Sequence, residues 1–492
     1  MSEQVISREQ DYLKISPYSL DKQPRALYLI SASNLWERFG YYTTRGILVL
    51  YMVKMLLFPS EKAYIIFAAF TALLYLTPLV GGYLADTFLG SKRAVVLGGM
   101  LLATGYFLLS VPGTRFFYIA LAMVIMGNGF FMPNISGVLG QIYEKNDPRR
   151  DGGFSILYSA VNAGAFIPPL ISASIISLLG WHSAFFMAGM GTLLGIAIFY
   201  FFIYRHSVLP KVKKSHYLII GSGLVLAVVL SEILVKNSKI ANIVLFLLGG
   251  LLILKTLKNS FQFSAQIRNR LFACLLLTAF SILFCVLCEQ AAMSLTLYTE
   301  YNVDRNWYVW MIPTVAFLAL NPFFIMTCGP LISKLWTWLD TKKMNPSIPS
   351  KFAFGTILVG LGFVILPLGI SMQESTGQIN LWWIVLSYFL QSLGELLVLP
   401  VGLSMMTRLS PKQMLGLMIG VWYFATAVAN VLAGVVSTWT VLPSENIAPL
   451  ATSIAYSWVF GILGWSALFA GAILLGFVKP MRKLIEGNMG QG

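Results

Sequence analysis

The chain has 492 residues, of which 57% are hydrophobic and 11% are charged, and its mean hydropathy is +0.76. This composition excludes an ordinary soluble protein and indicates that lipid is the solvent. The formal net charge is +15, but the basic residues cluster in short gaps between apolar runs. They therefore form no single basic stripe, and we expect the lipid bilayer as a partner and no nucleic acid.

The N-terminal segment and the cysteines restrict the class further. Residues 1–25 contain no basic stretch followed by a short apolar core and a cleavage site, so we expect no signal peptide to be removed. Cys274, Cys285, Cys288 and Cys328 all fall in apolar runs. The pair Cys285 and Cys288 cannot complete a tetrahedral metal site by itself. We expect no metal and no cofactor.

Apolar runs of about 20 residues, the length that crosses a bilayer as a helix, fill most of the chain. They lie near residues 26–55, 63–85, 93–111, 116–143, 153–177, 182–204, 217–235, 239–257, 271–299, 307–332, 352–371, 380–406, 412–440 and 455–478. The sequence therefore predicts an all-α polytopic membrane protein of about fourteen spans.

The spans divide the chain into two bundles of six with a two-helix hairpin between them. The predicted parts are an N-terminal tail 1–25, an N-terminal bundle 26–204, a linker with two extra helices 205–265, a C-terminal bundle 266–480 and a C-terminal tail 481–492. Six spans, a hairpin and six spans resemble the major facilitator fold, whose halves enclose a cavity near the bilayer midplane.

The distribution of basic residues predicts the orientation in the membrane. With the N-terminus inside, the inner segments hold 26 of the 34 Lys and Arg, and the outer loops hold six. The remaining two, Arg38 and Arg45, lie within the first span. Because basic loops stay in the cytoplasm, both termini are expected there.

A loop motif follows the second span. The stretch Gly81-Gly-Tyr-Leu-Ala-Asp86-Thr-Phe-Leu-Gly90-Ser-Lys92-Arg93 resembles the major facilitator motif G-G-x-x-A-D-x-x-G-x-[KR]. Glycine permits a tight turn and close approach of helices, and Asp86 is an acceptor for basic groups and helix ends. The residues assigned to this motif are Gly81, Gly82, Asp86, Gly90, Lys92 and Arg93.

Three stretches of the N-terminal half resemble the proton-dependent oligopeptide transporter (POT) family. They are Asn34-Leu-Trp-Glu37-Arg38-Phe-Gly-Tyr41-Tyr42, close to E-x-x-E-R-F-x-Y-Y; Gly127-Asn-Gly-Phe-Phe-Met132-Pro-Asn-Ile-Ser136, close to F-K-P-N-I-S; and Arg150 to Gly164, close to R-x-x-x-F-x-x-x-Y-x-x-x-N-x-G. The C-terminal half agrees at Glu289-Gln-Ala, Asn321-Pro322 and Ser392-Leu-Gly-Glu395. The resemblance thus extends over nearly all of the chain beyond the N-terminal tail.

Three carboxylates, Glu37, Glu289 and Glu395, lie deep within the twelve spans of the two bundles. A charge at that depth is costly unless it is paired or hydrated, so each is a candidate functional residue. Arg38 and Arg45 are the available cations. The first span also places Asn34, Glu37, Arg38, Tyr41, Tyr42 and Arg45 on one broad polar face, which should line the cavity. The alternative is a set of structural ion pairs, such as Arg45 with Glu289.

The resemblance implies import of di- and tripeptides by proton symport and alternating access, in a bacterial inner membrane. It assigns proton coupling to Glu37, Arg38, Glu289 and Arg45. It assigns the peptide amino terminus to Glu395, Asn162 and Asn321, the carboxylate to Arg38 and Tyr42, and further hydrogen bonds to Tyr41, Tyr75 and Tyr158. Trp422 would line a side-chain pocket, although a packed aromatic residue is an equal alternative.

Two positions depart from the family pattern. Asn34 replaces the first acid of E-x-x-E-R, and Met132 replaces the lysine of F-K-P-N-I-S. Loss of one partner of a buried ion pair is destabilising, whereas loss of both is electrically neutral, so we interpret the two changes as coordinated. Because that lysine is implicated in coupling, a different substrate, altered or absent coupling, or a non-transporting nutrient sensor remain alternatives.

Other function classes are less well supported by the residues. The spans contain no arrangement of nucleophile, histidine and carboxylate, so we expect no enzyme. The single charges are asymmetric and would not form the repeated ring of a channel pore. We expect the chain to function as a monomer.

Overall fold

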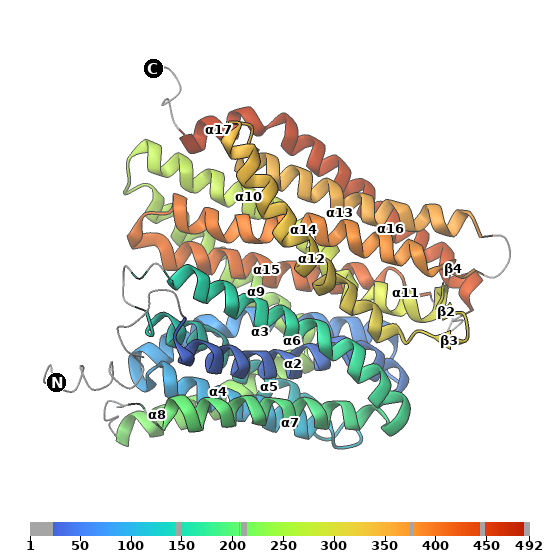
Figure 1. Ribbon diagram of the computed structural model, residues 1–492, viewed down its shortest axis with the longest axis horizontal. Helices are drawn as coiled ribbons and strands as arrows, with labels where there is room; N and C mark the ends of the chain where they lie inside the picture. Colours follow the sequence, from blue (N-terminus) through green and yellow to red (C-terminus); the bar gives the residue numbers. More distant parts are fainter. Residues whose placement is uncertain are drawn as a thin grey trace, which may run out of the picture. The chain divides into compact units, whose positions relative to one another are not determined.

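The computed structural model describes residues 23–143, 147, 149–205, 207, 214–373, 377–442 and 448–486. Most of them are in long helices (Figure 1). Of the expected tails 1–25 and 481–492, residues 1–22 and 487–492 lie outside the described residues. Residues 481–486 belong to the last described helix, Val478–Glu486. The chain divides into two compact units.

Unit 1 comprises Met1–Tyr51 and Leu73–Asn237, and unit 2 comprises Met52–Ala72 and Ser238–Gly492. The first helices, some of them shared between the units, are α2 (Arg25–Lys54), α3 (Ser60–Leu84), η1 (Ala85–Leu89), α4 (Ser91–Leu109), α5 (Phe117–Gly140), α6 (Arg150–Leu179), α7 (Trp181–Phe199), η2 (Tyr200–Tyr204) and α8 (Lys214–Lys236). The first segment of unit 1 ends at Tyr51, within α2, and the first segment of unit 2 ends at Ala72, within α3. The last turn of α2 and the first half of α3 therefore belong to unit 2.

Unit 2 contains the remaining helices. They are α9 (Ser238–Ser260), α10 (Ala265–Glu289), η3 (Gln290–Ala292), α11 (Ser294–Asn302), η4 (Thr314–Ala319), α12 (Leu320–Thr341), α13 (Ile348–Ser371), α14 (Leu381–Leu409), η5 (Lys412–Met414), α15 (Leu415–Thr438), α16 (Pro449–Gly476) and α17 (Val478–Glu486). The short helix α17 packs against α10, where the Arg270 side chain donates a 2.9 Å hydrogen bond to the carbonyl oxygen of Ile485.

Twelve helices within the described residues are long and apolar enough to cross a membrane. Two more have sufficient length, namely α8 with 23 residues and α2 with 30, although α2 carries the charges of Glu37, Arg38 and Arg45. The prediction of an all-α polytopic membrane protein is therefore confirmed.

The eighth span differs from its prediction. The run 307–332 was expected to form one helix, but its first residues form a hairpin in which strand β2 (Asn306–Trp307) is antiparallel to β3 (Trp310–Met311). Helix begins only at η4, directly after Pro313, and α12 continues to Thr341. Proline supplies no backbone donor, and aromatic and β-branched residues favour strands. A second short pair, β1 (Val303–Asp304) with β4 (Ile379–Asn380), is parallel.

Glycines let the helices approach closely within each unit. In unit 1, a Cβ added at Gly98 would lie 2.7 Å from the carbonyl oxygen of Gly127, so α4 and α5 cross backbone to backbone there. In unit 2, a Cβ at Gly360 would lie 2.9 Å from the carbonyl oxygen of Gly464, where α13 meets α16. Small residues at crossings are the usual means of helix association in membranes, since apolar burial gives no driving force in lipid.

The loop motif forms the π-helical turn η1 and the start of α4. Gly90 ends the turn with φ of 81°, and its N–H donates a 2.7 Å hydrogen bond to the carbonyl oxygen of Ala85. A positive φ is readily adopted only by glycine. Arg93 donates a 3.1 Å hydrogen bond to the carbonyl oxygen of Leu89; the side chain of Lys92 is buried, and that of Asp86 is exposed.

The two helices of the inserted hairpin belong to different units. Ile220 of α8 joins a buried cluster of unit 1 that includes Leu89 and Phe130. On α9, a Cβ added at Gly249 would collide with the ring of Phe424 on α15, so that helix packs tightly within unit 2. Only Asn237 separates α8 from α9.

Candidate functional site

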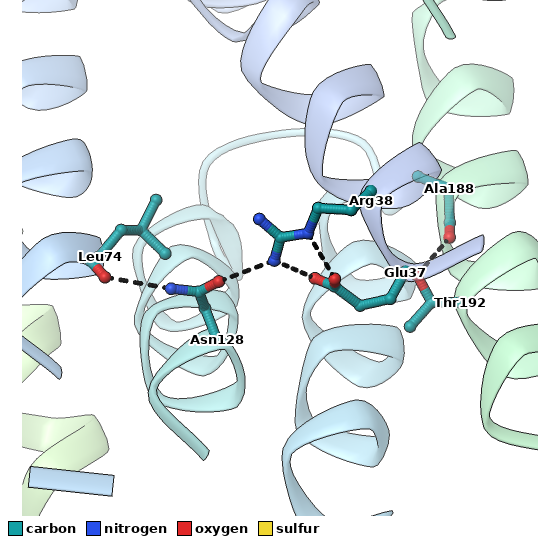
Figure 2. Close-up of polar contacts among 6 residues, drawn as sticks. All are labelled: Glu37, Arg38, Leu74, Asn128, Ala188 and Thr192. Atoms are coloured by element: carbon teal, nitrogen blue, oxygen red, sulfur yellow. Dashed lines mark hydrogen bonds and ion pairs between the residues drawn. The ribbon is translucent and has the colours of Figure 1, made fainter. Parts of the chain in front are cut away.

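A buried ion pair lies on helix α2 in unit 1 (Figure 2). Arg38 donates from Nε to Oε2 of Glu37 at 2.6 Å and from Nη2 to Oε1 at 2.8 Å. Both side chains are at most 5% exposed. Charges buried this deeply are retained only when paired, and the fork geometry of the guanidinium matches both carboxylate oxygens. The pair is neutral as a whole.

Asn128 of α5 connects this ion pair to a third helix. Its Oδ1 accepts a 3.1 Å hydrogen bond from Nη2 of Arg38, and its Nδ2 donates at 3.0 Å to the carbonyl oxygen of Leu74 on α3 (Figure 2). The guanidinium carbon of Arg38 also lies 4.8 Å from the centre of the Tyr41 ring, within the range of a cation–π contact. Arg38 is therefore held by groups on two helices.

Helices α6 and α7 enclose the same part of α2. A Cβ at Gly164 would lie 2.7 Å from the carbonyl oxygen of Leu35 and 2.8 Å from Cβ of Arg38, and only glycine permits this approach. Two residues before it, buried Asn162 donates a 2.9 Å hydrogen bond to the carbonyl oxygen of Tyr158. Tyr158 itself is exposed. On α7, the hydroxyl of Thr192 donates a 2.9 Å hydrogen bond to the carbonyl oxygen of Ala188 in the same helix (Figure 2).

The other candidates of unit 1 lie around this centre with different burial. Tyr42 and Arg45 on α2 and Tyr75 on α3 are half-buried. Of the two departures from the family pattern, Asn34 is 5% exposed and Met132 is 41% exposed. Asn34 precedes Arg38 by one helical turn, and Met132 follows Asn128 by one turn.

The second candidate centre lies in unit 2, where α12 meets α14. Asn321 donates from Nδ2 to Oε2 of Glu395 at 2.7 Å and to Oγ of Ser392 at 3.1 Å. Ser392 in turn donates to the carbonyl oxygen of Tyr388 at 2.7 Å. Glu395 is half-buried, whereas Ser392 is buried. The carboxylate is thus oriented by a neutral amide on a neighbouring helix.

Glu289 is buried at the point where the seventh span is interrupted. Helix α10 ends at Glu289, and Met293, with φ of −119° and ψ of −105°, separates the short helix η3 from α11. The side chain of Gln290 stabilises this break, because it donates to the carbonyl oxygen of Ala433 at 3.1 Å and accepts from Ser437 at 2.8 Å. Irregular backbone at membrane depth requires such internal partners.

Trp422 is buried on α15. A Cβ at Gly402 of α14 would collide with its indole ring, and the ring of Phe352 lies 6.4 Å away between centroids. These contacts support packing of the indole between helices. Its assignment to a substrate pocket stays a prediction.

Comparison with known proteins identifies the family of this chain. A family model described as POT family matches residues 92–459. The chain is 34% identical over 481 residues to dipeptide and tripeptide permease B of Salmonella typhimurium strain LT2, covering 96% of this chain and 98% of the relative. The chain belongs to the POT family. Dipeptide and tripeptide permease A of Edwardsiella piscicida is also 34% identical, over 478 residues, with 95% and 96% covered.

Solved structures of POT transporters share the fold. A peptide transporter POT in complex with sulfate has a TM-score of 0.83 and 29% identity, with 98% of this chain and 99% of that chain covered. A structure described as giving insights into substrate recognition in proton dependent oligopeptide transporters has a TM-score of 0.82 and 31% identity, covering 93% and 99%. The resemblance to this family, and to the major facilitator fold, is confirmed.

Three buried polar residues have no role in the assignments made from sequence, namely Asn128, Gln290 and Ser392. Each is buried in the middle of an otherwise apolar span. That position was itself the available signal, because a polar side chain inside the bilayer must find a partner within the protein. Their partners could not be identified from sequence, since they lie on other helices.

Proposed function

We propose that this POT protein imports di- and tripeptides together with protons by alternating access. The observation that carries the proposal is the 34% identity of the chain, over 481 residues, to a relative named dipeptide and tripeptide permease B. The proposal makes the protein a permease and no enzyme. It operates as a monomer in a bacterial inner membrane, with both termini in the cytoplasm.

In unit 2, Glu395 binds the peptide ammonium group. Its carboxylate accepts a 2.7 Å hydrogen bond from Asn321, and this bond orients the group without neutralising its charge. A carboxylate fixed in this way is suited to a charge-assisted hydrogen bond with a cation. Trp422 lines a side-chain pocket of unit 2, and Asn162 is a further peptide-binding candidate in unit 1.

In unit 1, Arg38 binds the peptide carboxylate with Tyr42. Two of its nitrogens, Nε and Nη2, already donate to Glu37. A proton on Glu37 would remove the negative charge that holds the guanidinium, and Arg38 would then favour an incoming carboxylate. Proton uptake and peptide binding are thereby linked at one side chain. Tyr41, Tyr75 and Tyr158 add hydrogen bonds, and Arg45 and Glu289 complete the proton-coupling groups.

The second candidate function is a POT transporter whose coupling or substrate differs. Asn34 and Met132, where the family pattern has an acid and a lysine, favour it. This lysine is part of the pattern that implies proton coupling, and an electrically neutral loss of both charges preserves the fold. The two candidates share the scaffold and differ in how transport depends on the proton gradient.

Uptake by purified protein in liposomes distinguishes the functions. For a proton-coupled importer, an inward proton gradient should drive accumulation of a labelled dipeptide above its external concentration, and excess unlabelled tripeptide should compete. Uptake that only equilibrates, with or without the gradient, would identify an uncoupled carrier. Peptide binding without any uptake would identify a sensor. The same assay on Glu232→Gln is the control for variants of the site residues, because this change removes an acid that pairs with Lys236 on the surface of α8.

A further inference from the structure

An exposed apolar hairpin projects from unit 2 between α11 and η4. Strands β2 and β3 pair Asn306 with Met311 and Trp307 with Trp310. Tyr308 and Val309 at the tip are each 92% exposed, Trp310 is 77% exposed and Met311 is 63% exposed. No charged residue occurs between Asn306 and Pro313. Such a concentration of exposed apolar side chains marks an interaction surface.

The geometry of the turn does not explain the residues at its tip. Two-residue hairpin turns favour pairs such as Asn-Gly, because residues there need positive φ. Here the pair is Tyr308 and Val309, and Tyr308 has φ of 53°. A bulky residue in this region carries strain that the surroundings must compensate. Something other than turn chemistry therefore favours aromatic and aliphatic side chains at this tip.

The hairpin lies at the level where the spans of unit 2 end. It joins the spans Ala265–Asn302 and Thr314–Thr341 directly. The ring of Trp307 lies 5.4 Å from that of Trp382, the second residue of α14. Exposed Trp439 follows the end of α15, which the alternation of spans places at the same face. Tryptophan and tyrosine collect at this level because they have an apolar body and a polar edge.

Charged groups fasten only the base of the hairpin. Arg305 donates to the carbonyl oxygen of Ile312 at 3.2 Å, and the N–H of Ile312 donates to the carbonyl oxygen of Arg305 at 2.9 Å. Arg305 also lies 3.5 Å from the carboxylate of Glu300, which accepts hydrogen bonds from Thr314 and Lys54. The hairpin therefore has a polar, well-bonded base and an apolar tip.

We propose that Tyr308, Val309 and Trp310 insert into the phospholipid bilayer at the boundary between headgroups and acyl chains, as an interfacial anchor of unit 2. The occupant of this surface is the membrane that the protein spans. The tip is uncharged, aromatic and continuous with the span ends, which is the chemistry of that boundary. A two-stranded hairpin of this length is marginal in water, and lipid contact supplies the missing support.

Site-directed spin labelling tests the proposal. The four native cysteines are replaced by serine, and a label is attached to Val309→Cys or, separately, to Trp310→Cys. The matched control is Glu61→Cys, at an exposed charged residue of unit 2 in the first turn of α3. Retained peptide uptake and a single symmetric elution peak verify folding. Collision with oxygen and with a water-soluble nickel chelate is then measured in proteoliposomes.

We expect labels at both hairpin positions to collide several-fold less with the nickel chelate, and more with oxygen, than the label at Glu61→Cys. Equal accessibility at all three positions would place the tip in water and overturn the proposal. Protection that disappears when each lipid nanodisc holds a single protein would also overturn it, because a second copy of the chain would then be the occupant.

Discussion

Asn321 donates a 2.7 Å hydrogen bond to Glu395 across the contact of α12 with α14. This bond orients the carboxylate, and its donor is a neutral amide. We expect Glu395→Gln to weaken dipeptide binding at least tenfold, about 1.4 kcal/mol, because the peptide ammonium loses a charged partner. Isothermal titration calorimetry on the purified protein measures the affinity for dipeptide.

The control for this prediction is Glu232→Gln, which removes an acid whose partner is Lys236, one turn further along α8. Its affinity for dipeptide should equal that of the unaltered protein. If Glu395→Gln also binds normally while its thermal stability is unchanged, Glu395 does not contact the substrate.

A second prediction concerns the buried amide of Asn128. Asn128→Leu removes one acceptor from Arg38 and one donor from the carbonyl oxygen of Leu74. We expect a loss of stability of about 1–3 kcal/mol, since buried polar groups are left without partners. Asn134→Leu is the control, because Asn134 donates within its own helix to Phe130 at 2.8 Å. Denaturation in detergent should separate the variants; equal losses would contradict the bridging role of Asn128.

The close contact of α6 with α2 gives a third prediction. The methyl group of Gly164→Ala would lie 2.7 Å from the carbonyl oxygen of Leu35, so the helices must separate. We expect a destabilisation of about 1–3 kcal/mol from overpacking, with reduced uptake because Arg38 shifts. Gly221→Ala on α8 is the control, since no atom lies within 4 Å of the added carbon. Its stability should stay equal or rise, and a similar loss in both variants would refute the packing argument.

Local patterns of the sequence predict the spans because helix length and apolarity are properties of one segment. They also place Glu37, Arg38 and Tyr41 on one helix, where the structure finds them in contact. The break after Glu289 was not predictable in the same way. The run 271–299 is apolar over most of its length and shows no break, whereas the break depends on hydrogen bonds of Gln290 with Ala433 and Ser437, which lie on another helix.

The eighth span illustrates a second limit. Hydropathy assigns the same value to an apolar residue in a lipid-facing helix and in an apolar hairpin. For this reason the predicted eighth span, 307–332, includes residues 307–313. The helix begins directly after Pro313, and proline in the sequence is a signal for this start because it suits the beginning of a helix. The proximity of Asn321 to Glu395 likewise depends on how α12 and α14 pack, which a single sequence does not specify.

The last prediction concerns Asn34 and Met132, and the geometry of unit 1 sharpens it. Arg38 on α2 meets Asn128 on α5 at 3.1 Å. Asn34 lies four residues before Arg38, and Met132 lies four residues after Asn128. Because the chain reverses direction three times between α2 and α5, from α2 to α3, from α3 to α4 and from α4 to α5, these two helices run antiparallel. Both positions therefore lie one turn, about 5.4 Å, from the same contact and on the same side of it.

We expect Asn34→Glu with Met132→Lys to be tolerated better than the sum of the single changes. The two new charges can neutralise each other at this level, with a favourable coupling of about 1–3 kcal/mol, the range for contacting residues. The two single changes should differ in how much stability they cost, since Asn34 is 5% exposed and Met132 is 41% exposed. A buried unpaired glutamate is costly, whereas a lysine at a half-open position extends its ammonium into water.

A double-mutant cycle on thermal stability in detergent measures the coupling, and proton-driven peptide uptake by the double variant provides the functional readout. Asn34→Gln with Met132→Leu serves as the uncharged control and should show no coupling. Additive effects in the charged cycle would mean that the two positions do not interact, and the changes at Asn34 and Met132 would then be independent. A favourable coupling with a stronger dependence of uptake on the proton gradient would assign the missing pair to proton coupling.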